Sequence, residues 1–475
     1  MAPLKLDLDG VDTGDSGAAD TGADVSNLAA SDLELLTDMD LAQRFENKHR
    51  GDLRHISEQE RWIAHDGKRW RIDTDHRASK LARGLLEPLV KHAKAIRCRP
   101  GTVKSLGSAI RPDAMLKLAK GPLAVSINEI DSDENLLGTP SGILDLRTGQ
   151  VTEGDRSRFV LKSLTVDPAP RADCPRWLET LRFAMAGDDD MVAYRQRQAG
   201  YFLVGNYREE VFFEEHGRGG NGRGTFFETL ARILGTDRDT GYAVGIDRSL
   251  LVSFQGKDNQ HPAAVAALAG KRLAVCSEFT IGDRLDVGML TKLTGGDSIP
   301  ARFMGGNFFN FVNVAKIVVC PNMLLRTPVV TGGFERRTRY GHWTQKAATA
   351  DTGLKDYLYH KEASAILRWA IEGAALWRKH GLAPPARLRA DTADYLRKAD
   401  SFGQWLDERC DVEPAATAAQ PSLRRSYEDF CTAQGYPPPS GQGFADELDR
   451  RGFQKFRSGA QGGDMRRGLR LKAYT

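Results

Sequence analysis

At the centre of the sequence stands Gly217-Arg218-Gly219-Gly220-Asn221-Gly222-Arg223-Gly224-Thr225, a segment rich in glycine. Residues 211–213 before it are β-rich, and apolar residues recur at helical spacing over residues 226–234 after it. The pattern predicts a strand, a loop and a helix. Glycines let backbone N–H groups converge at a helix N-terminus, where the partial positive charge favours an anion.

The segment is similar to the phosphate-binding pattern G-x-x-x-x-G-K-[ST], with Gly217 and Gly222 as the two framing glycines. Arg223 replaces the lysine and Gly224 replaces the hydroxyl residue. Thr225 comes one position late, about 100° further around a helix. Arginine keeps the charge, but its planar fork differs from a compact ammonium. A plain turn before a helix is the alternative at this point.

Charge is unevenly distributed along the 475 residues, although the net charge is only +4. Residues 1–40 carry ten acids and one basic residue, Lys5, whereas residues 450–475 carry eight basic residues and one acid, Asp464. The two ends therefore have separate roles. The length allows two or three domains, one of them large enough to bury a full sheet.

The six cysteines are far apart in the sequence and include no C-x-x-C pair. This argues against a structural zinc site and against a disulfide framework. No apolar run is long enough to span a bilayer, and the first thirty residues lack the pattern of a secretion signal. We expect a cytoplasmic protein, in the host cell cytosol, with no membrane partner.

The part before the glycine-rich segment divides into a leader and a mixed region. Residues 1–35 are acidic and contain no aromatic residue, which predicts a disordered leader. Residues 36–170 read as an α+β region, in which Asp66-Gly67 joins two short strands into a hairpin. Helical patterns follow over residues 81–92 and 112–120. No residue of this region is predicted to be catalytic.

The order of motifs resembles the phage/plasmid primase-helicase family. The resemblance is carried by the tryptophan-flanked hairpin over 61–72, residues 142–149, Cys174-Pro175-Arg176-Trp177, Gln198-Ala199-Gly200-Tyr201 and the glycine-rich segment. The motor of that family is a superfamily 3 helicase of the AAA+ type. The resemblance therefore implies an ATPase core over residues 171–350. About sixty residues precede the hairpin, too few for the polymerising primase domain that many relatives carry.

Two polar residues follow apolar strand patterns after the loop. Glu278 ends the pattern over 271–278, and the resemblance makes it the Walker B acid that holds Mg²⁺ or polarises the attacking water. A core strand with a solvated acid is the alternative. Asn322 ends the pattern over 316–322, and the resemblance makes it the sensor that orients water against the γ-phosphate.

Residues 293–302 with 307–311 resemble the family's β-hairpin, which grips DNA in the pore of a ring. Arg302 and Lys316 are the candidate DNA contacts of this region, and the phenylalanines are predicted to be core. In residues 332–337, Arg336 or Arg337 matches the arginine finger of the family. A finger acts in trans and implies a ring; a solvated surface is the alternative.

The C-terminal part is expected to begin with a helical extension and linker over 351–398, which includes Pro384-Pro385. Residues 399–475 predict helices and a basic β-ribbon, as in the winged-helix domain of the relatives. Its basic residues suit a phosphate backbone, although a basic tail is often only a solvated face. The candidates are Arg451, Lys455, Arg457, Arg466 and Arg467.

The expected fold class is α/β, an AAA+ P-loop NTPase core with an N-terminal α+β region and a C-terminal winged helix. The resemblance implies a hexameric, ATP- and Mg²⁺-dependent DNA helicase for phage or plasmid replication, acting on single-stranded DNA and an origin beside a separate primase or host replication proteins. Arg223 keeps an alternative open: a DNA-binding ring, such as a prophage remnant, with little or no ATPase. A small-molecule kinase explains neither the hairpin nor the basic tail.

Overall fold

The computed structural model describes residues 27–253, 262–280, 283–304, 306, 308–325, 332–434, 440–457 and 463–473. The chain forms two compact units, which are described separately. The first unit holds residues up to Asp66 together with Ile72–Ser126. The second holds Gly67–Arg71 and the chain from Ile127 onward.

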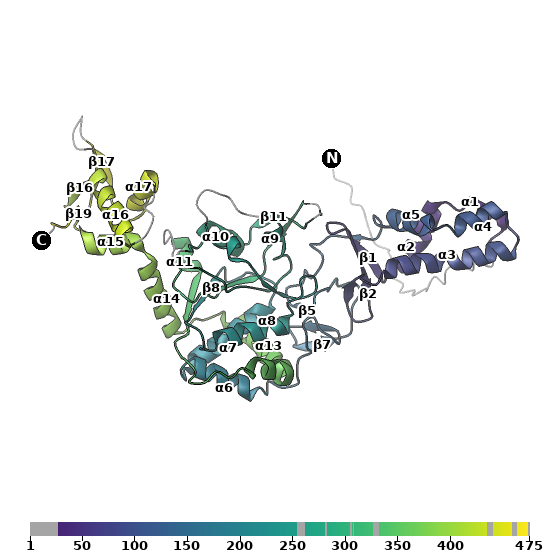
Figure 1. Cartoon of the computed structure of the whole chain (residues 1–475), viewed down its shortest axis with the longest axis horizontal. Helices are drawn as coiled ribbons and strands as arrows, with labels where there is room; N and C mark the ends of the chain where they lie inside the picture. The colour runs from purple at the N-terminus through teal and green to yellow at the C-terminus, as the bar shows by residue number, and fades with distance from the viewer. Residues whose placement is uncertain are drawn as a thin grey trace, which may run out of the picture. The chain divides into compact units, whose positions relative to one another are not determined.

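The first unit packs helices around a small sheet (Figure 1). Strand β1 pairs antiparallel with β2 and parallel with β4. Buried Phe45, Leu53 and Leu89 belong to one apolar core. The elements are α1 (Ala30–Leu35), α2 (Asp38–His49), β1 (Leu53–Ile56), β2 (Arg61–His65), α3 (Arg77–Ala95), α4 (Pro100–Leu106), α5 (Ile110–Ala119) and β4 (Ala124–Val125).

The end of the predicted disordered leader is helical. Residues 30–35 form α1, because Leu33 is only 2% exposed and packs into the core of the first unit. The prediction was therefore wrong for these residues, and residues 1–26 lie outside the described part of the chain. The helices expected over 81–92 and 112–120 are confirmed as α3 and α5.

Short strands precede the main sheet of the second unit. Both predicted hairpin strands exist, as β2 and β3 (Trp70–Ile72). An antiparallel sheet of order β5-β6-β7 follows, built from β5 (Leu136–Gly138), β6 (Ile143–Asp145) and β7 (Gln150–Thr152).

The main sheet has five parallel strands in the order β14-β8-β13-β10-β9. This confirms the α/β class with a mainly parallel sheet. Because all strands run the same way, the segments that follow them gather at one edge, where ligands bind in such sheets. The strands are β8 (Phe212–His216), β9 (Ala243–Gly245), β10 (Leu273–Cys276), β13 (Lys316–Val319) and β14 (Thr338–His342).

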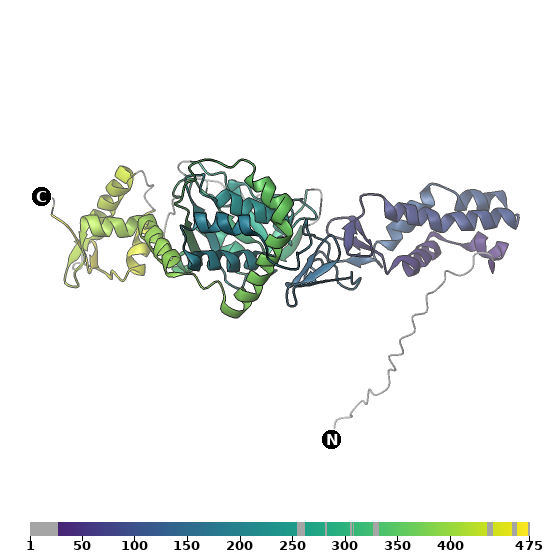
Figure 2. The same cartoon turned by 90° about the horizontal axis from the view of Figure 1, so that it is seen from below.

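Apolar cores cover both faces of this sheet, as expected for parallel strands. Phe213 packs into one core with α7 and α13, which lie side by side in Figures 1 and 2. Phe212 packs into the other core with α10 and a β-hairpin. The elements are α6 (Pro175–Ala184), α7 (Asp189–Leu203), α8 (Arg223–Leu234), the 3₁₀ turn η2 (Arg248–Leu250), α9 (Pro262–Ala266), α10 (Val287–Thr294), β11 (Ser298–Arg302), β12 (Phe308–Val312), α11 (Gly332–Arg337), α12 (Leu354–Tyr357), the π-turn η3 (Leu358–Glu362) and α13 (Ala363–His380).

The predicted linker is a packed helix. Residues 386–399 form α14 (Ala386–Ala399), which contacts strand β14. Tyr395 stacks on Tyr340 with ring centroids 4.4 Å apart, and Leu388 and Leu396 are buried. The charged residues between them misled the sequence interpretation, because the buried ones recur with helical period.

Three helices and a three-stranded sheet of order β16-β18-β17 make up the C-terminal part, with Trp405, Tyr427 and Phe444 in its core. The three predicted helices are confirmed. The elements are α15 (Ser401–Arg409), β15 (Cys410–Asp411), β16 (Thr417–Ala419), α16 (Gln420–Gln434), α17 (Gly441–Arg450), β17 (Lys455–Arg457), β18 (Asp464–Arg467) and β19 (Arg470–Leu471). Across the described residues, no helix combines the length and apolarity needed to cross a bilayer.

Candidate nucleotide site and its surroundings

The glycine-rich segment lies between strand β8 and helix α8, so the predicted strand, loop and helix are confirmed. Gly219, Gly220 and Gly222 have φ of 90°, 64° and 85°, in the left-handed region that glycine adopts without strain. Among the described residues, no hydrogen-bond acceptor pairs with the N–H groups of these three glycines or with those of Gly224 and Thr225. The loop therefore presents unpaired donors at a helix N-terminus, an arrangement that suits phosphate.

Asn221 fixes the shape of this loop. Its side chain is 3% exposed, its Nδ2 donates to the carbonyl of Trp343 at 3.1 Å, and its Oδ1 accepts from the backbone N–H of Arg223 at 3.2 Å. A Cβ on Gly217 would lie 2.0 Å from that Nδ2, so only glycine fits there. Asn221 and Gly217 thus shape the cradle, and the neighbouring backbone N–H groups offer the anion contacts.

Arg223 turns its guanidinium into the protein. One terminal nitrogen donates to the carbonyls of Glu215, Gly217 and Pro321 at 3.0, 3.3 and 2.5 Å. The other donates to Oδ1 of Asn322 at 2.9 Å. Arginine can make this set of bonds because it has five donors in a planar fork, whereas a lysine ammonium has three. The side chain therefore joins the loop to the end of β13.

Glu278 and Asn322 lie at the ends of neighbouring strands, on the same edge of the sheet as the loop. Glu278 is exposed two residues after β10, and Asn322 is exposed three residues after β13. The strands are in register, with Cys276 opposite Val319. The fold thus brings together three segments that the sequence interpretation assigned to one site.

The residues at this edge fit a magnesium ion that a nucleotide brings with it. Mg²⁺ in phosphate sites is held by substrate oxygens, waters and one or two carboxylates. Glu278 supplies one exposed carboxylate, and Thr225 is half-buried in the first turn of α8. The described residues contain no group of three His, Cys, Asp or Glu side chains that could hold a metal by themselves.

A buried ion pair, missed in the sequence interpretation, supports the strand before the loop. Arg195 of α7 binds Glu215 of β8 through two bonds of 2.5 and 2.8 Å, and both side chains are at most 1% exposed. Gln198 and the indole N–H of Trp343 donate to the same carboxylate at 3.1 and 2.7 Å. The network joins α7, β8 and the end of β14 directly behind the cradle.

Two further titratable residues of β8 lie beside this network. Burial raises the pKa of Glu214 to about 8, with an added contribution from Glu215 and an opposing one from the Tyr395 hydroxyl. Burial lowers the pKa of His216 to about 4, and the nearby His342 and Arg223 lower it further. Both side chains are therefore largely uncharged at pH 7. His216 and His342 also line a pocket of about 600 Å³ next to Gly219.

We predict that Glu214→Gln flattens the decline of stability at alkaline pH. The folded pKa of Glu214 is raised from 4.5 to about 8, so folding retains a proton that the unfolded chain releases. Stability from this group is complete below pH 4.5 and is lost as pH rises to 8, at about 1.4 kcal/mol per unit. His216 acts in the opposite direction below pH 6.5. Between pH 6.5 and 8 the variant should therefore gain about 2 kcal/mol on the wild type, measured by urea unfolding. Equal slopes would contradict the buried carboxyl.

The two candidate finger arginines lie at the opposite edge of the sheet from the loop. They end α11, directly before Thr338, which pairs with Phe212 at the start of β8. Arg337 donates to Thr294 at 3.1 Å and to Glu210 at 3.3 Å, and its side chain is 11% exposed. Arg336 is 68% exposed and lies 3.5 Å from Glu210. One β8 length, about 16 Å, separates them from the loop of the same chain.

The predicted hairpin exists as β11 and β12, paired from Ser298 with Val312 to Arg302 with Phe308. Phe309 and Phe311 are buried, which confirms them as core, but Phe308 is 64% exposed, so that prediction was wrong. Residues alternate between the two faces of a strand, and Phe308 falls on the outer one. Arg302 is exposed and lies over the Phe308 ring, 4.9 Å from its centroid.

Lys316 cannot be a DNA contact in this structure. It is fully buried at the start of β13, where its Nζ donates to the carbonyls of Val204 and Val314. Burial holds the pKa of its ammonium well below the usual value, and the nearby Arg272 lowers it further. The sequence interpretation took the residue for a surface cation because lysine is rarely buried.

The basic C-terminal residues fall into two groups. Arg466 is fully buried and bonds to Asp449 and Gln420, and Arg451 binds Asp400 at 2.6 Å and Glu447 at 2.7 Å. Both stabilise the C-terminal core, so their prediction as phosphate contacts is corrected. The exposed candidates on β17 and β18 are Lys455, Arg457 and Arg467.

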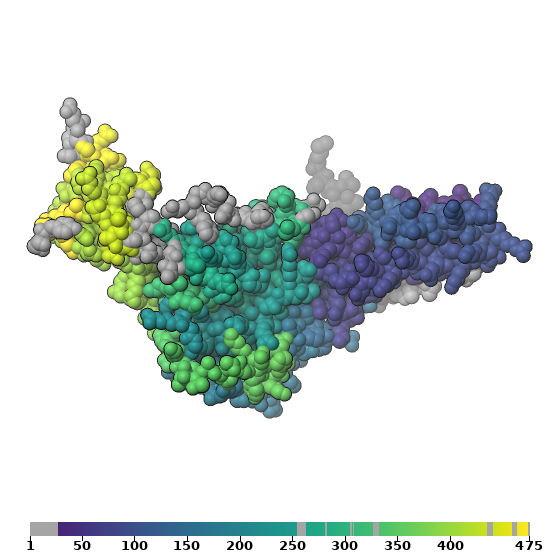
Figure 3. All heavy atoms as spheres, viewed as in Figure 1, coloured from purple at the N-terminus to yellow at the C-terminus, as the bar shows by residue number. Residues whose placement is uncertain are grey.

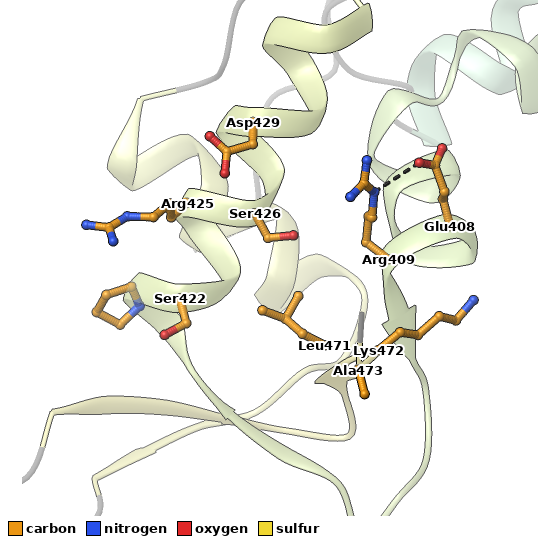
Figure 4. Close-up of a pocket in the computed structure, with 10 residues that line it drawn as sticks. Glu408, Arg409, Ser422, Arg425, Ser426, Asp429, Leu471, Lys472 and Ala473 are labelled. Carbon is orange, nitrogen blue, oxygen red and sulfur yellow. Dashed lines mark hydrogen bonds and ion pairs between the residues drawn. The ribbon is translucent and has the colours of Figure 1, made fainter. Parts of the chain in front are cut away.

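A pocket of about 800 Å³ lies elsewhere in the C-terminal part, between α15, α16 and the end of β19 (Figure 4). Cations and acids both line it. Arg409 donates to Glu408 at 2.9 Å, and Lys472 donates to the carbonyl of Asp407 at 2.6 Å. Its mixed charge favours no single class of ligand.

Comparison with known families decides the wider relationship. Residues 42–186 match the family described as D5 N terminal like, and residues 216–337, which contain the loop, Glu278 and Arg336, match a family of unknown function. The motif order described above spans both matches. The chain is a phage-type primase-helicase family protein.

Two curated relatives of this primase-helicase family protein carry helicase names. Protein 121R of Invertebrate iridescent virus 3 is 24% identical over 202 residues, which cover 41% of this chain and 21% of the relative. Protein L207/L206 of Acanthamoeba polyphaga mimivirus is 22% identical over 308 residues, which cover 59% of this chain and 31% of the relative. The chain thus spans about a fifth to a third of the length of these relatives.

Solved structures of the NrS-1 C-terminal region in its apo form also match this primase-helicase family protein. One match has 11% identity, covers 90% of this chain and 99% of that chain, and has a TM-score of 0.46. Another has 8% identity, covers 91% and 99%, and has a TM-score of 0.44.

Proposed function

We propose that this chain is an ATP-dependent DNA helicase motor of the superfamily 3, AAA+ type, which works as a hexameric ring in phage or plasmid replication. The observation that carries the proposal is the cradle of unpaired N–H groups at Gly219–Thr225, on the same sheet edge as Glu278 and Asn322. The helicase names of the two viral relatives support the same role.

In this proposal the loop binds the phosphates of ATP, and Glu278 orients and polarises the attacking water. When bound, Mg²⁺ neutralises charge on the phosphates. Asn322 can hydrogen-bond the water or the γ-phosphate without changing its own charge. The arginine finger must come from a neighbouring subunit, because Arg336 lies a strand length from the loop of its own chain.

The DNA contacts in this proposal are the outer face of the β11–β12 hairpin and the basic ribbon of a winged-helix C-terminal part. Phe308 and Arg302 offer a stacking surface and a phosphate contact. Single-stranded DNA in the pore, an origin sequence and a separate primase or host replication proteins are the partners that we propose.

A second function is favoured by the position of Arg223. Its guanidinium donates to four acceptors of the protein, so binding of phosphates must compete with these bonds. If that competition is lost, the chain is a DNA-binding ring with little or no ATPase. The two functions share the DNA surfaces and differ in turnover.

We predict that Glu278→Gln lowers DNA-stimulated ATP hydrolysis by about 10²- to 10⁴-fold, the usual contribution of a positioned base. The measurement is phosphate release by the purified protein with and without single-stranded DNA. Glu372→Gln, which removes an exposed acid from α13, is the matched control and should keep wild-type activity.

The wild-type result separates the two functions. Turnover that depends on both DNA and Glu278 supports the helicase motor. DNA binding without turnover supports the inactive ring. Turnover that survives Glu278→Gln would contradict the role proposed for this residue.

We further predict that Phe308→Ala weakens binding of a single-stranded oligonucleotide by about 1–3 kcal/mol, the usual contribution of a stacked aromatic residue. Val312→Ala is the control, because Val312 is 50% exposed on the same face of β12 but cannot stack. Fluorescence anisotropy measures both. An equal loss in the two variants would show that the ring of Phe308 is not a stacking platform.

A further inference from the structure

A row of exposed cations follows one face of α3 in the first unit. Lys80, Arg83, Lys91 and Lys94 occur with Glu87 at steps of three, four, four and three residues, and all five are exposed. At 3.6 residues per turn they fall within about 80° around the helix. The opposite face carries the buried apolar side chains, among them Ala82, Leu86 and Leu89. We call the four cations the α3 basic stripe.

The charge of the stripe is not neutralised by neighbouring side chains. Among the described residues, no carboxylate lies within ion-pair distance of the four cations. Residues 77–120 contain eleven Lys and Arg against two acids, Glu87 and Asp113, although the whole chain carries a net charge of only +4. The helical part of the first unit, drawn in purple and blue in Figures 1 and 3, is thus the most basic stretch that the sequence interpretation passed over.

Such a row costs stability when nothing binds it. Like charges three or four residues apart on a helix destabilise it, and Lys80 with Arg83 and Lys91 with Lys94 are two such pairs. A solvated helix face is usually built with both signs interspersed. An uncompensated row of one sign instead suits a partner that carries regularly spaced charge of the other sign.

The dimensions of the stripe point to the same partner. From Lys80 to Lys94 the helix rises about 21 Å, and duplex DNA presents one phosphate charge per about 1.7 Å of its axis. Lysine and arginine side chains that contact phosphates fix position without reading bases.

We propose that the α3 basic stripe is a DNA-backbone site, separate from the hairpin and from the C-terminal ribbon. The choice of DNA rests on the proposed function. The site binds by charge, without sequence preference, and it needs neither nucleotide nor turnover.

The test uses the full chain without nucleotide, with a fluorescein-labelled 20-mer as a single strand and as a duplex. Anisotropy gives the affinity from 50 to 200 mM salt. Replacing all four cations by glutamine, which keeps helix propensity, should weaken binding at 50 mM salt about tenfold or more. The slope of log K against log salt should become shallower by up to about 3.6 for the duplex or about 2.8 for the single strand, and the larger loss identifies the preferred form.

Two matched variants make the result specific. Lys91→Gln with Lys94→Gln should lose about half of that slope, whereas Lys361→Gln with Lys379→Gln, two exposed cations of the second unit, should lose none. Glu87→Gln removes the one acid of the row and should tighten binding, which tests the site even if the fourfold variant folds poorly.

The outcomes separate this site from the proposed function. Wild-type affinity and slope in the fourfold variant, or no tightening by Glu87→Gln, overturn the site while the helicase proposal stands, and leave an acidic protein as the partner of the stripe. No DNA binding by the wild type overturns both.

Discussion

Arg336→Ala is expected to lower DNA-stimulated ATP hydrolysis by about 10³-fold or more, while DNA binding stays at the wild-type level. Arg336 is the exposed member of its pair, whereas Arg337 is held by Thr294 and Glu210. An arginine finger stabilises charge that develops on the transferred phosphoryl group, so its loss acts on kcat. Steady-state phosphate release at saturating ATP and DNA measures the effect.

The control and the decisive experiment both follow from the distance between Arg336 and the loop. Arg337→Ala should lower thermal stability, because it leaves Glu210 and Thr294 without their partner. Mixing Arg336→Ala with Glu278→Gln should restore activity at about a quarter of the sites of a ring, where intact halves meet. Two inactive proteins that stay inactive when mixed would exclude a shared site.

The second large effect is expected from the buried ion pair behind the cradle. Glu215→Gln should lower the free energy of unfolding by about 3–5 kcal/mol, because it leaves the Arg195 guanidinium charged and without its carboxylate in a dry interior. Urea unfolding followed by the fluorescence of Trp343, which donates to Glu215, measures the change.

An exposed pair supplies the comparison. Lys398→Ala removes the ion pair with Asp394 on α14, which is 2.6 Å long and open to solvent, and should cost at most about 1 kcal/mol. Similar losses in Lys398→Ala and Glu215→Gln would mean that burial does not set the energetics of the Arg195–Glu215 pair.

The sequence was informative where short-range chemistry dictates structure. The glycine loop, its strand and helix, and the order of apolar strands follow from local patterns, and all are present. Alternation along a strand also predicts that Arg466 and Arg467 face opposite sides of β18. The structure buries Arg466 and exposes Arg467, so treating the two as one basic patch was the error.

Partners across the fold could not be predicted in the same way. Two adjacent glutamates in an apolar strand indicate that a buried charge needs a partner, but nothing local identifies Arg195 as that partner. The buried Lys316 is a similar case, because its acceptors are carbonyls about a hundred residues away and next to it. The α3 basic stripe, by contrast, is readable from spacing alone.

One contact of α14 has a practical consequence for shortened forms of the chain. Strand β14 is the outermost strand of its sheet, and an uncovered outer strand invites pairing with another molecule and aggregation. Thr392 of α14 occupies this edge, since its hydroxyl accepts from the backbone N–H of Tyr340 at 3.1 Å. A version that ends near Gly381 would expose that edge, whereas one that ends after Ala399 keeps it covered.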